Sequence, residues 1–183
     1  MLSIDKIFPY IVSSSWVDSV GLPSLVAESL ARDVYVVLVS DEGNVVKNIH
    51  PNELSALGLS VDDAFHHATM NHHEAWNDQR FQVGFGESPE GFSFGAADGS
   101  WLAPGVLLNS AFYEQMSESL QSKELVVVVP NQELLIVFPN LPHCLNSSRI
   151  RQLLAEARHH PKQVSETFLL LNGEWPSELV LRQ

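Results

Sequence analysis

Residues 124–138 carry the sequence ELVVVVPNQELLIVF, which decides the class of fold. Two apolar runs, Glu124–Val129 and Glu133–Phe138, flank the turn residues Pro130-Asn131-Gln132. Short apolar runs bounded by turn residues predict a β-hairpin. Because nearly every position in both runs is apolar, both faces of these strands should be buried. We therefore expect this hairpin to lie at the centre of a sheet.

The same succession of two strands and a helix is predicted elsewhere along the chain. One hairpin is expected over Asp33–Ser40 and Val45–Ile49, and another over Arg80–Phe85 and Gly91–Ala96. Helices should follow the hairpins over residues 51–57, 61–76, 103–120 and 148–159, and a last strand pair should begin at residue 167. This order predicts an α+β fold, a mainly antiparallel sheet built from successive strand–strand–helix units with helices packed on it.

One domain is predicted for residues 1–183, because 45% of the residues are apolar and no Pro/Gly/Ser linker separates two halves. Residues 1–31 are expected to form an N-terminal helical segment, broken at Pro9, Gly21 and Pro23. Residues 33–183 should hold the strand–strand–helix units.

The chain is acidic, with a net charge of −12, which argues against binding nucleic acid or an anionic membrane over a broad face. The basic residues of the last third gather on the helix expected over 148–159, either as a solvated face or as a docking face for an acidic partner. The sequence has no apolar run long enough for a transmembrane helix, and its first residues do not form a secretory signal. With Cys144 as its single cysteine, we expect a cytoplasmic protein.

Several segments between residues 33 and 138 together form a recognisable pattern. The pattern is a strand pair, an L-x-x-L-G-L-S helix turn, a helix ending near an asparagine, and a later apolar strand ending in proline. The matching segments are Val34–Asp41, Asn52–Ser60, Asp63–Asn71 and Leu125–Pro130 with Glu133-Leu134-Leu135, all within residues 33–138. These segments resemble the uncharacterised YtpQ-like family of bacterial proteins. That family has no assigned chemistry, so the resemblance implies a bacterial cytosolic protein and assigns no site.

Histidines gather on the helix expected over 61–76, which carries His66, His67, His72 and His73. At 100° per residue, Asp62, His66 and His73 share one flank of this helix, so they are candidate ligands of a metal ion. The alternative is structural, because the helix dipole favours aspartate in the first turn and histidine toward the end. We expect no metal, and no cofactor.

His72 differs from its neighbours because it lies on the apolar stripe of the same helix. We expect it to be buried and neutral, since burial disfavours the charged imidazole. No partner for its ring is evident, so replacement by leucine should be neutral or stabilising.

No catalytic residue is assigned from the sequence. A lone cysteine such as Cys144 is usually a small buried apolar residue. The glycines of Gly84-Phe85-Gly86 precede no Gly-Lys-Ser/Thr and no helix, so they do not form a phosphate-binding loop.

The second hairpin has alternating apolar residues, and with Gly86–Gly91 as its loop all five should share one face: Phe81, Val83, Phe85, Phe92 and Phe94. The opposite face would then be nearly bare, with Gln82, Gly84, Ser93 and Gly95. Glycine in a strand often marks a close approach, so this face is the candidate interaction surface, either for the C-terminal strands or for a partner. The alternative is an edge hairpin with a solvated outer face.

The hypothesis for function is a non-enzymatic soluble interaction or regulatory protein of the bacterial cytosol. Its partner would be an unidentified protein or a second copy of the chain. The alternative is a metal-dependent hydrolase that uses the histidine-rich helix 61–76.

Overall fold

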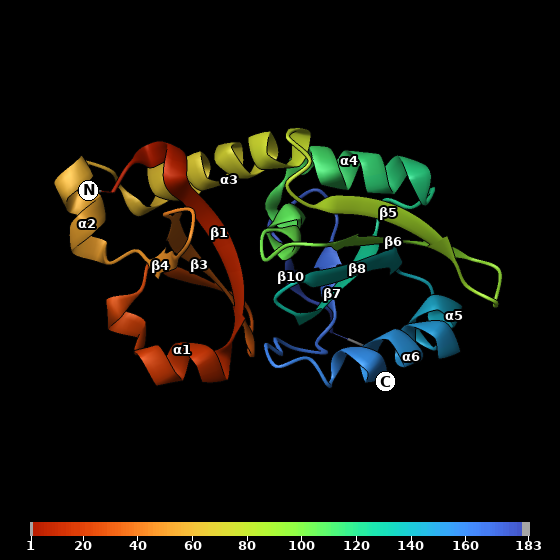
Figure 1. Ribbon diagram of the computed structural model, residues 1–183. Helices are drawn as coiled ribbons and strands as arrows, with labels where there is room; N and C mark the ends of the chain where they lie inside the picture. The colour runs from red at the N-terminus through yellow and green to blue at the C-terminus, as the bar shows by residue number, and fades with distance from the viewer. Residues whose placement is uncertain (1, 181–183) are drawn as a thin grey trace.

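The computed structural model describes residues 2–180, whose strands form two antiparallel sheets (Figure 1). The first sheet has the order β1-β3-β2, with β4 also paired to β3. Its strands are β1 (Ile7–Ser13), β2 (Ala27–Ala31), β3 (Val34–Asp41) and β4 (Val46–Asn48). The second sheet has the order β10-β9-β7-β8-β6-β5. Its strands are β5 (Gln82–Glu87), β6 (Ser93–Asp98), β7 (Leu125–Asn131), β8 (Leu134–Pro139), β9 (Leu169–Leu171) and β10 (Ser177–Glu178).

The predicted α+β class is confirmed, with antiparallel pairing throughout, although the strands are divided between two sheets. The α-helices are α1 (Ser14–Val20), α2 (Pro51–Leu57), α3 (Val61–Asn77), α4 (Ser110–Ser119), α5 (Pro142–Leu145) and α6 (Ser148–Ala157). Short 3-10 helices are η1 (Ile4–Lys6), η2 (Leu22–Ser24) and η3 (Ala103–Leu108). In Figure 1, α3 and α4 run along one side of the molecule, and α1 and α6 lie on the opposite side. Within residues 2–180, every helix is too short or too polar to span a membrane.

The segment over 1–31, predicted to be helical throughout, is instead mixed: it contains α1 with η1 and η2, and also the strands β1 and β2. β1 pairs along its whole length with β3, from Ile7 opposite Ser40 to Ser13 opposite Val34. Pro9, which suggested a helix break, is accommodated because β1 lies at the edge of its sheet, where a strand residue can lack an N–H.

The helix expected over 103–120 is divided at Asn109. Residues 103–108 form η3, and the Asn109 side chain then caps α4 by accepting a hydrogen bond from the Ala111 N–H at 3.0 Å. The predicted helices α2 and α3 are confirmed, including Gly58 as the left-handed residue after α2 and Ser60 as the cap of α3. Asn109 thereby lies at the start of a helix rather than inside one.

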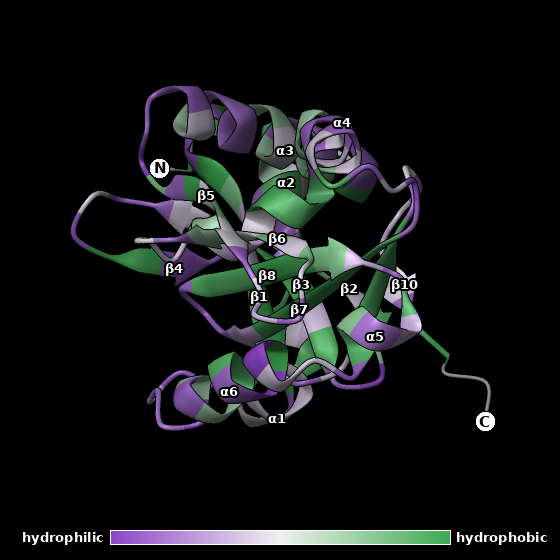
Figure 2. Cartoon of the chain, turned by 90° about the vertical axis from the view of Figure 1, so that its right-hand side faces the viewer, coloured by the Kyte–Doolittle hydropathy of each residue, from purple (hydrophilic) through white to green (hydrophobic). Residues whose placement is uncertain are grey.

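The apolar core has two parts. The larger cluster contains side chains of both sheets together with α3, η3 and α4, among them Ile7, Leu38 and Leu135. A smaller cluster lies between the other face of the second sheet and α5 and α6, and includes Phe94 and Phe138. All seven residues of β7 are buried, as expected of a central strand covered on both faces. Figure 2 shows apolar residues concentrated on the strands and polar residues on outer helix turns and loops.

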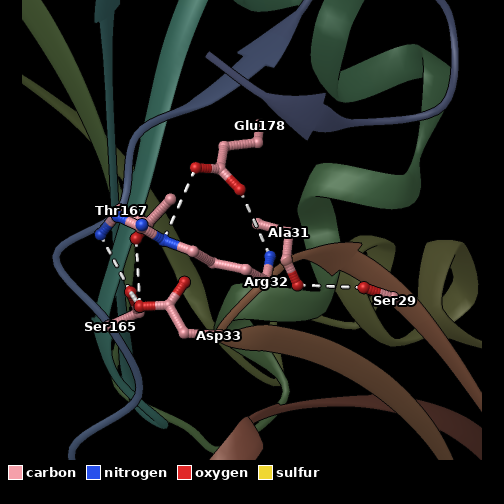
Figure 3. Close-up of polar contacts among 7 residues, drawn as sticks. All are labelled: Ser29, Ala31, Arg32, Asp33, Ser165, Thr167 and Glu178. Atoms are coloured by element: carbon pink, nitrogen blue, oxygen red, sulfur yellow. Dashed lines mark hydrogen bonds and ion pairs between the residues drawn. The ribbon is translucent and has the colours of Figure 1, made fainter. Parts of the chain in front are cut away.

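Hydrogen bonds connect the turn between β2 and β3 to the C-terminal segment that contains β9 and β10 (Figure 3). Asp33 Oδ2 accepts hydrogen bonds from the hydroxyls of Ser165 at 2.6 Å and Thr167 at 3.0 Å. The Arg32 N–H donates to Glu178 Oε2 at 3.2 Å. These contacts join residues more than 130 positions apart in sequence, and they hold the edge of the first sheet against β10.

Candidate functional site

Two surface regions contain most of the candidate metal-binding and interaction residues named from the sequence. The first is a groove of about 510 Å³ between α3 and the start of α4, here called the histidine groove. It is lined by His66, Thr69, Met70, His73, Glu74, Asn109, Ser110 and Ala111. His66 and His73 therefore do face one groove, but Asp62, the third candidate ligand, does not line it.

The ring of His73 is already engaged in this groove. The Asn109 amide lies 2.9 Å from His73 Nδ1, and its oxygen is used in capping α4, so the amide NH₂ donates and Nδ1 accepts. The neutral ring then carries its proton on Nε2. Nε2 is the remaining ring nitrogen, and it must lose that proton before it can bind a metal.

The ligand set of a metal site is not assembled here. Among residues 2–180, no three side chains of the types His, Cys, Asp and Glu gather where they could hold a metal ion. Asp63 acts instead in the cap of α3, where its carboxylate accepts a hydrogen bond from the Ser60 hydroxyl at 2.6 Å and its pKa is lowered by that contact. The position of Asp63 at the start of α3 is therefore accounted for by capping, which supports the structural alternative for this residue.

His72 is buried, as predicted, with 1% of its surface exposed. Burial lowers its pKa from 6.5 to about 4, so the ring is neutral at pH 7. Its Nε2 lies 2.7 Å from the Leu102 carbonyl oxygen, so this nitrogen donates a hydrogen bond that the sequence did not reveal. The expected neutral effect of leucine at this position is corrected accordingly, because the replacement removes a buried hydrogen bond.

Cys144 is completely buried in the smaller core cluster. Burial raises the pKa of its thiol, which disfavours the nucleophilic thiolate. The cysteine therefore packs as a small apolar side chain, as the sequence indicated.

The second region is the hairpin of β5 and β6, whose register differs from the prediction. Phe85 lies opposite Gly95, and Gly86 lies opposite Phe94. The loop is Pro89-Glu90-Gly91, closed by a hydrogen bond from the Ser88 N–H to the Phe92 carbonyl at 2.8 Å, with Gly91 at a φ of +84°. This is a three-residue hairpin loop with a left-handed glycine, whereas a six-residue loop was expected.

The change of register places the two sets of aromatic residues on opposite faces, because successive strand residues alternate. Val83 and Phe85 share one face with Ala97 and Gly95, and Phe94 lies on the other face. The predicted surface of Gln82, Gly84, Ser93 and Gly95 is therefore not a single face. Gln82 and Gly84 lie on the Phe94 side, and Ser93 and Gly95 lie on the Phe85 side.

Gly95 does mark a close approach, and the element that approaches is α4. A Cβ atom at this position would lie 2.8 Å from both the Met116 sulfur and a Val137 methyl carbon. The contact is part of the core rather than a surface for another protein. Gly84 is different, because a Cβ atom there would meet no atom within 4 Å.

β5 is the last strand of the second sheet, and one of its edges is unpaired (Figure 1). In an antiparallel pair, the backbone groups of every second residue point toward the neighbouring strand, and the hydrogen bond between Ser88 and Phe92 shows which residues these are. The backbone N–H and C=O groups of Gln82, Gly84 and Gly86 therefore point toward β6. The backbone N–H and C=O groups of Val83, Phe85 and Glu87 therefore face outward. The Phe85 side chain is 51% exposed beside this edge. We call the outer side of Gln82–Glu87 the β5 edge.

A hollow of about 310 Å³ adjoins the β5 edge on the face opposite Phe85. It is lined by Gln82, Val83, Gly84, Phe85, Gly86, Phe94, Ala96 and Asp98. An added strand would thus meet unpaired backbone groups at the edge, an exposed aromatic ring on one face and this hollow on the other.

The tip of the hairpin is anchored, so the edge is held in place. The Glu90 carboxylate accepts hydrogen bonds from the Ser147 hydroxyl at 3.0 Å and the Ser148 N–H at 2.7 Å, at the start of α6. The hydroxyls of Ser148 and Ser88 also donate to it. These contacts lower the pKa of Glu90 to about 2, so the carboxylate stays charged at the positive end of the helix.

Comparison with protein-family models, curated proteins and solved structures gave no match for this chain. The function is therefore inferred from the geometry of the two regions. The β5 edge was missed in the sequence because strand order and hairpin register were both needed to find it.

Proposed function

We propose that this protein is a non-enzymatic interaction module that binds an extended segment of a partner protein along the β5 edge. The observation that carries the proposal is the outward-facing backbone of Val83, Phe85 and Glu87 on a terminal strand of the sheet. Proteins usually protect such an edge with lysine, proline, a bulge or a covering element. Gln82–Glu87 contains neither lysine nor proline, and its pairing with β6 has no bulge.

Addition of a strand to an open sheet edge is a common way to bind extended peptides. Each outward residue can exchange two backbone hydrogen bonds with an antiparallel partner, and each bond contributes about 0.5–1.5 kcal/mol net. Covering the exposed half of Phe85 adds about 1 kcal/mol. Part of this gain is offset by ordering the peptide, so an affinity in the micromolar range is expected.

The remaining features support binding rather than catalysis. The thiol of Cys144 is buried with a raised pKa, and His73 Nδ1 is engaged by Asn109. We place the protein in the bacterial cytosol because of its single cysteine and its resemblance to the YtpQ-like family. For a hydrolase that uses the histidine-rich helix, His66 and His73 do line one groove, but among the described residues no third ligand joins them.

Two replacements of Phe85 test the proposal. Both Phe85→Ala and Phe85→Pro remove the ring, but only proline removes the outward N–H and places its own ring in the path of an added strand. Nonapeptides selected from a random phage-displayed library on the unmodified protein are the probe, with affinity measured by fluorescence anisotropy.

We expect Phe85→Ala to weaken binding by about five- to tenfold, and Phe85→Pro to abolish it, with both variants folded by circular dichroism. Equal affinity of the two variants would show that backbone pairing at β5 plays no part in binding, and the proposal would be wrong.

A further inference from the structure

The hollow beside the β5 edge has an ordered lining. Three cross-strand pairs follow one another on this face: Gly86 with Phe94, Gly84 with Ala96, and Gln82 with Asp98. Successive pairs lie two residues apart, which is about 6.8 Å along a strand. The hollow is therefore apolar at the Phe94 end and acidic at the Asp98 end.

The apolar end has room for one side chain at Gly84. A Cβ atom on Gly86 would lie 2.6 Å from the tip of the Phe94 ring, so that ring already covers Gly86. Gly84 has no atom within 4 Å of its Cβ position, and Ala96 beside it is small. A residue of an added strand opposite Gly84 can therefore place an apolar side chain against Phe94 and Ala96.

The acidic end has no cation of its own. Asp98 is exposed, makes no ion pair among the described residues, and is the only charged residue that lines the hollow. The chain as a whole carries a net charge of −12. A lysine or arginine opposite Gln82 has to reach across about two strand spacings, near 10 Å, to meet this carboxylate, which suits a long basic side chain.

We infer that the partner segment runs antiparallel to β5 and has an apolar residue opposite Gly84 followed, two positions later, by a basic residue that pairs with Asp98. The antiparallel direction follows from the second sheet, in which every pairing is antiparallel. The residue before the apolar one lies opposite Phe85 and covers its ring. This inference rests on the proposed function of the β5 edge and specifies the chemistry of its partner.

The test uses the same random nonapeptide library, selected on the full-length protein. Enriched peptides should share an apolar-x-basic pattern, and replacing their basic residue with glutamate should weaken binding by about five- to tenfold. Asp98→Lys should reverse this preference, so that the glutamate peptide binds better than the original. Glu174→Lys is the matched charge control, because Glu174 lies in the connection between β9 and β10 and does not line the hollow.

Gly84→Val tests the apolar end. The new side chain has space, so the variant should fold and should lose peptide binding by filling the hollow.

The outcomes separate the two claims. If the selected peptides no longer bind Phe85→Pro but bind Asp98→Lys as tightly as the unmodified protein, the inferred partner chemistry is wrong and the proposed function stands. If no selected peptide depends on Phe85→Pro, both claims are wrong. Sedimentation of the peptide-free protein gives a third outcome. A dimer at micromolar concentration that Phe85→Pro dissociates would identify a second copy as the occupant of the β5 edge, against the inferred basic segment.

Discussion

Replacing His72 with leucine measures how a buried polar residue is accommodated in the core. Nε2 of His72 donates to the Leu102 carbonyl, which also accepts a hydrogen bond from the Gly105 N–H at 3.0 Å. The carbonyl keeps that second bond in the variant, so the lost hydrogen bond costs about 1 kcal/mol. A Cβ atom on Gly105 would lie 2.9 Å from the imidazole, so the planar ring fits a narrow space. Branched leucine adds a misfit of about 1 kcal/mol. At pH 7.5 we expect His72→Leu to lower the free energy of unfolding by about 1–2 kcal/mol.

The difference should depend on pH. The pKa of His72 is about 4 in the folded protein and 6.5 when exposed, chiefly because of burial, with a smaller contribution from the nearby charge of Arg80. A lowered histidine pKa gives stability that is present above pH 6.5 and is lost as the pH falls toward 4, because the unfolded chain takes up the proton first. At pH 5 this uptake lowers the free energy of unfolding of the unmodified protein by about 2 kcal/mol. His72→Leu avoids that loss.

Urea unfolding at pH 7.5, 6.0 and 5.0, followed by circular dichroism, gives the comparison. Other titrating groups are common to both proteins and cancel in the difference. The variant should be less stable at pH 7.5 and about equal to the unmodified protein at pH 5.0. A difference that stays constant from pH 7.5 to 5.0 would refute the neutral, buried state of His72.

Three further predictions concern the contacts that hold the sheets and the hairpin. Gly95→Val should lower the free energy of unfolding by about 1–3 kcal/mol because it overpacks the contact with α4, whereas Gly84→Val should be neutral or stabilising; thermal melts of the pair check this. Asp33→Ala should lower the free energy of unfolding in urea by about 1–3 kcal/mol, since the hydroxyls of Ser165 and Thr167 lose their acceptor. Asp33→Asn should lower it less, because the asparagine side chain keeps one acceptor oxygen. Glu90→Gln should speed amide exchange at the hairpin tip. The stabilisation of the tip by the charged carboxylate is fully present above pH 4.5 and is lost as the pH falls toward 2. Amide exchange at the tip should therefore speed up with acid in the unmodified protein but not in Glu90→Gln.

The central strands were predictable because their signal is local. Every residue of β7 is apolar or turn-forming, and burial on both faces follows from composition alone. The helix boundaries at Gly58 and Ser60 were predictable for the same reason, since caps depend on single residues. The resemblance to the YtpQ-like family stays a prediction.

The errors arose where position in the sheet decides the structure. Pro9 is compatible with β1 because β1 is an edge strand, and strand order is not evident from a local sequence pattern. In the second hairpin, Pro89 and Gly91 carried the signal of a three-residue loop. A loop that includes the flanking glycines shifts the predicted register by an odd number of residues. Residues from opposite faces of the hairpin, such as Phe85 and Phe94, are then predicted to share one face.

The candidate sites were predictable only in part. His66 and His73 do line one groove, as their spacing on the helix indicated, but Asn109 was missed because it was placed inside a helix. Asparagine followed by serine just before an apolar turn is a capping signal that was available in the sequence.

Backbone amide hydrogen exchange along β5, followed by NMR, tests the central claim most directly. In the free protein, the amides of Val83, Phe85 and Glu87 should exchange rapidly, whereas those of Gly84 and Gly86 should be protected by their hydrogen bonds to β6. With a saturating apolar-x-basic nonapeptide, the three outward amides should become protected together. Protection of these amides in the free protein, or no change in their exchange when the peptide is bound, would contradict the account of β5 as an open edge that accepts a partner strand.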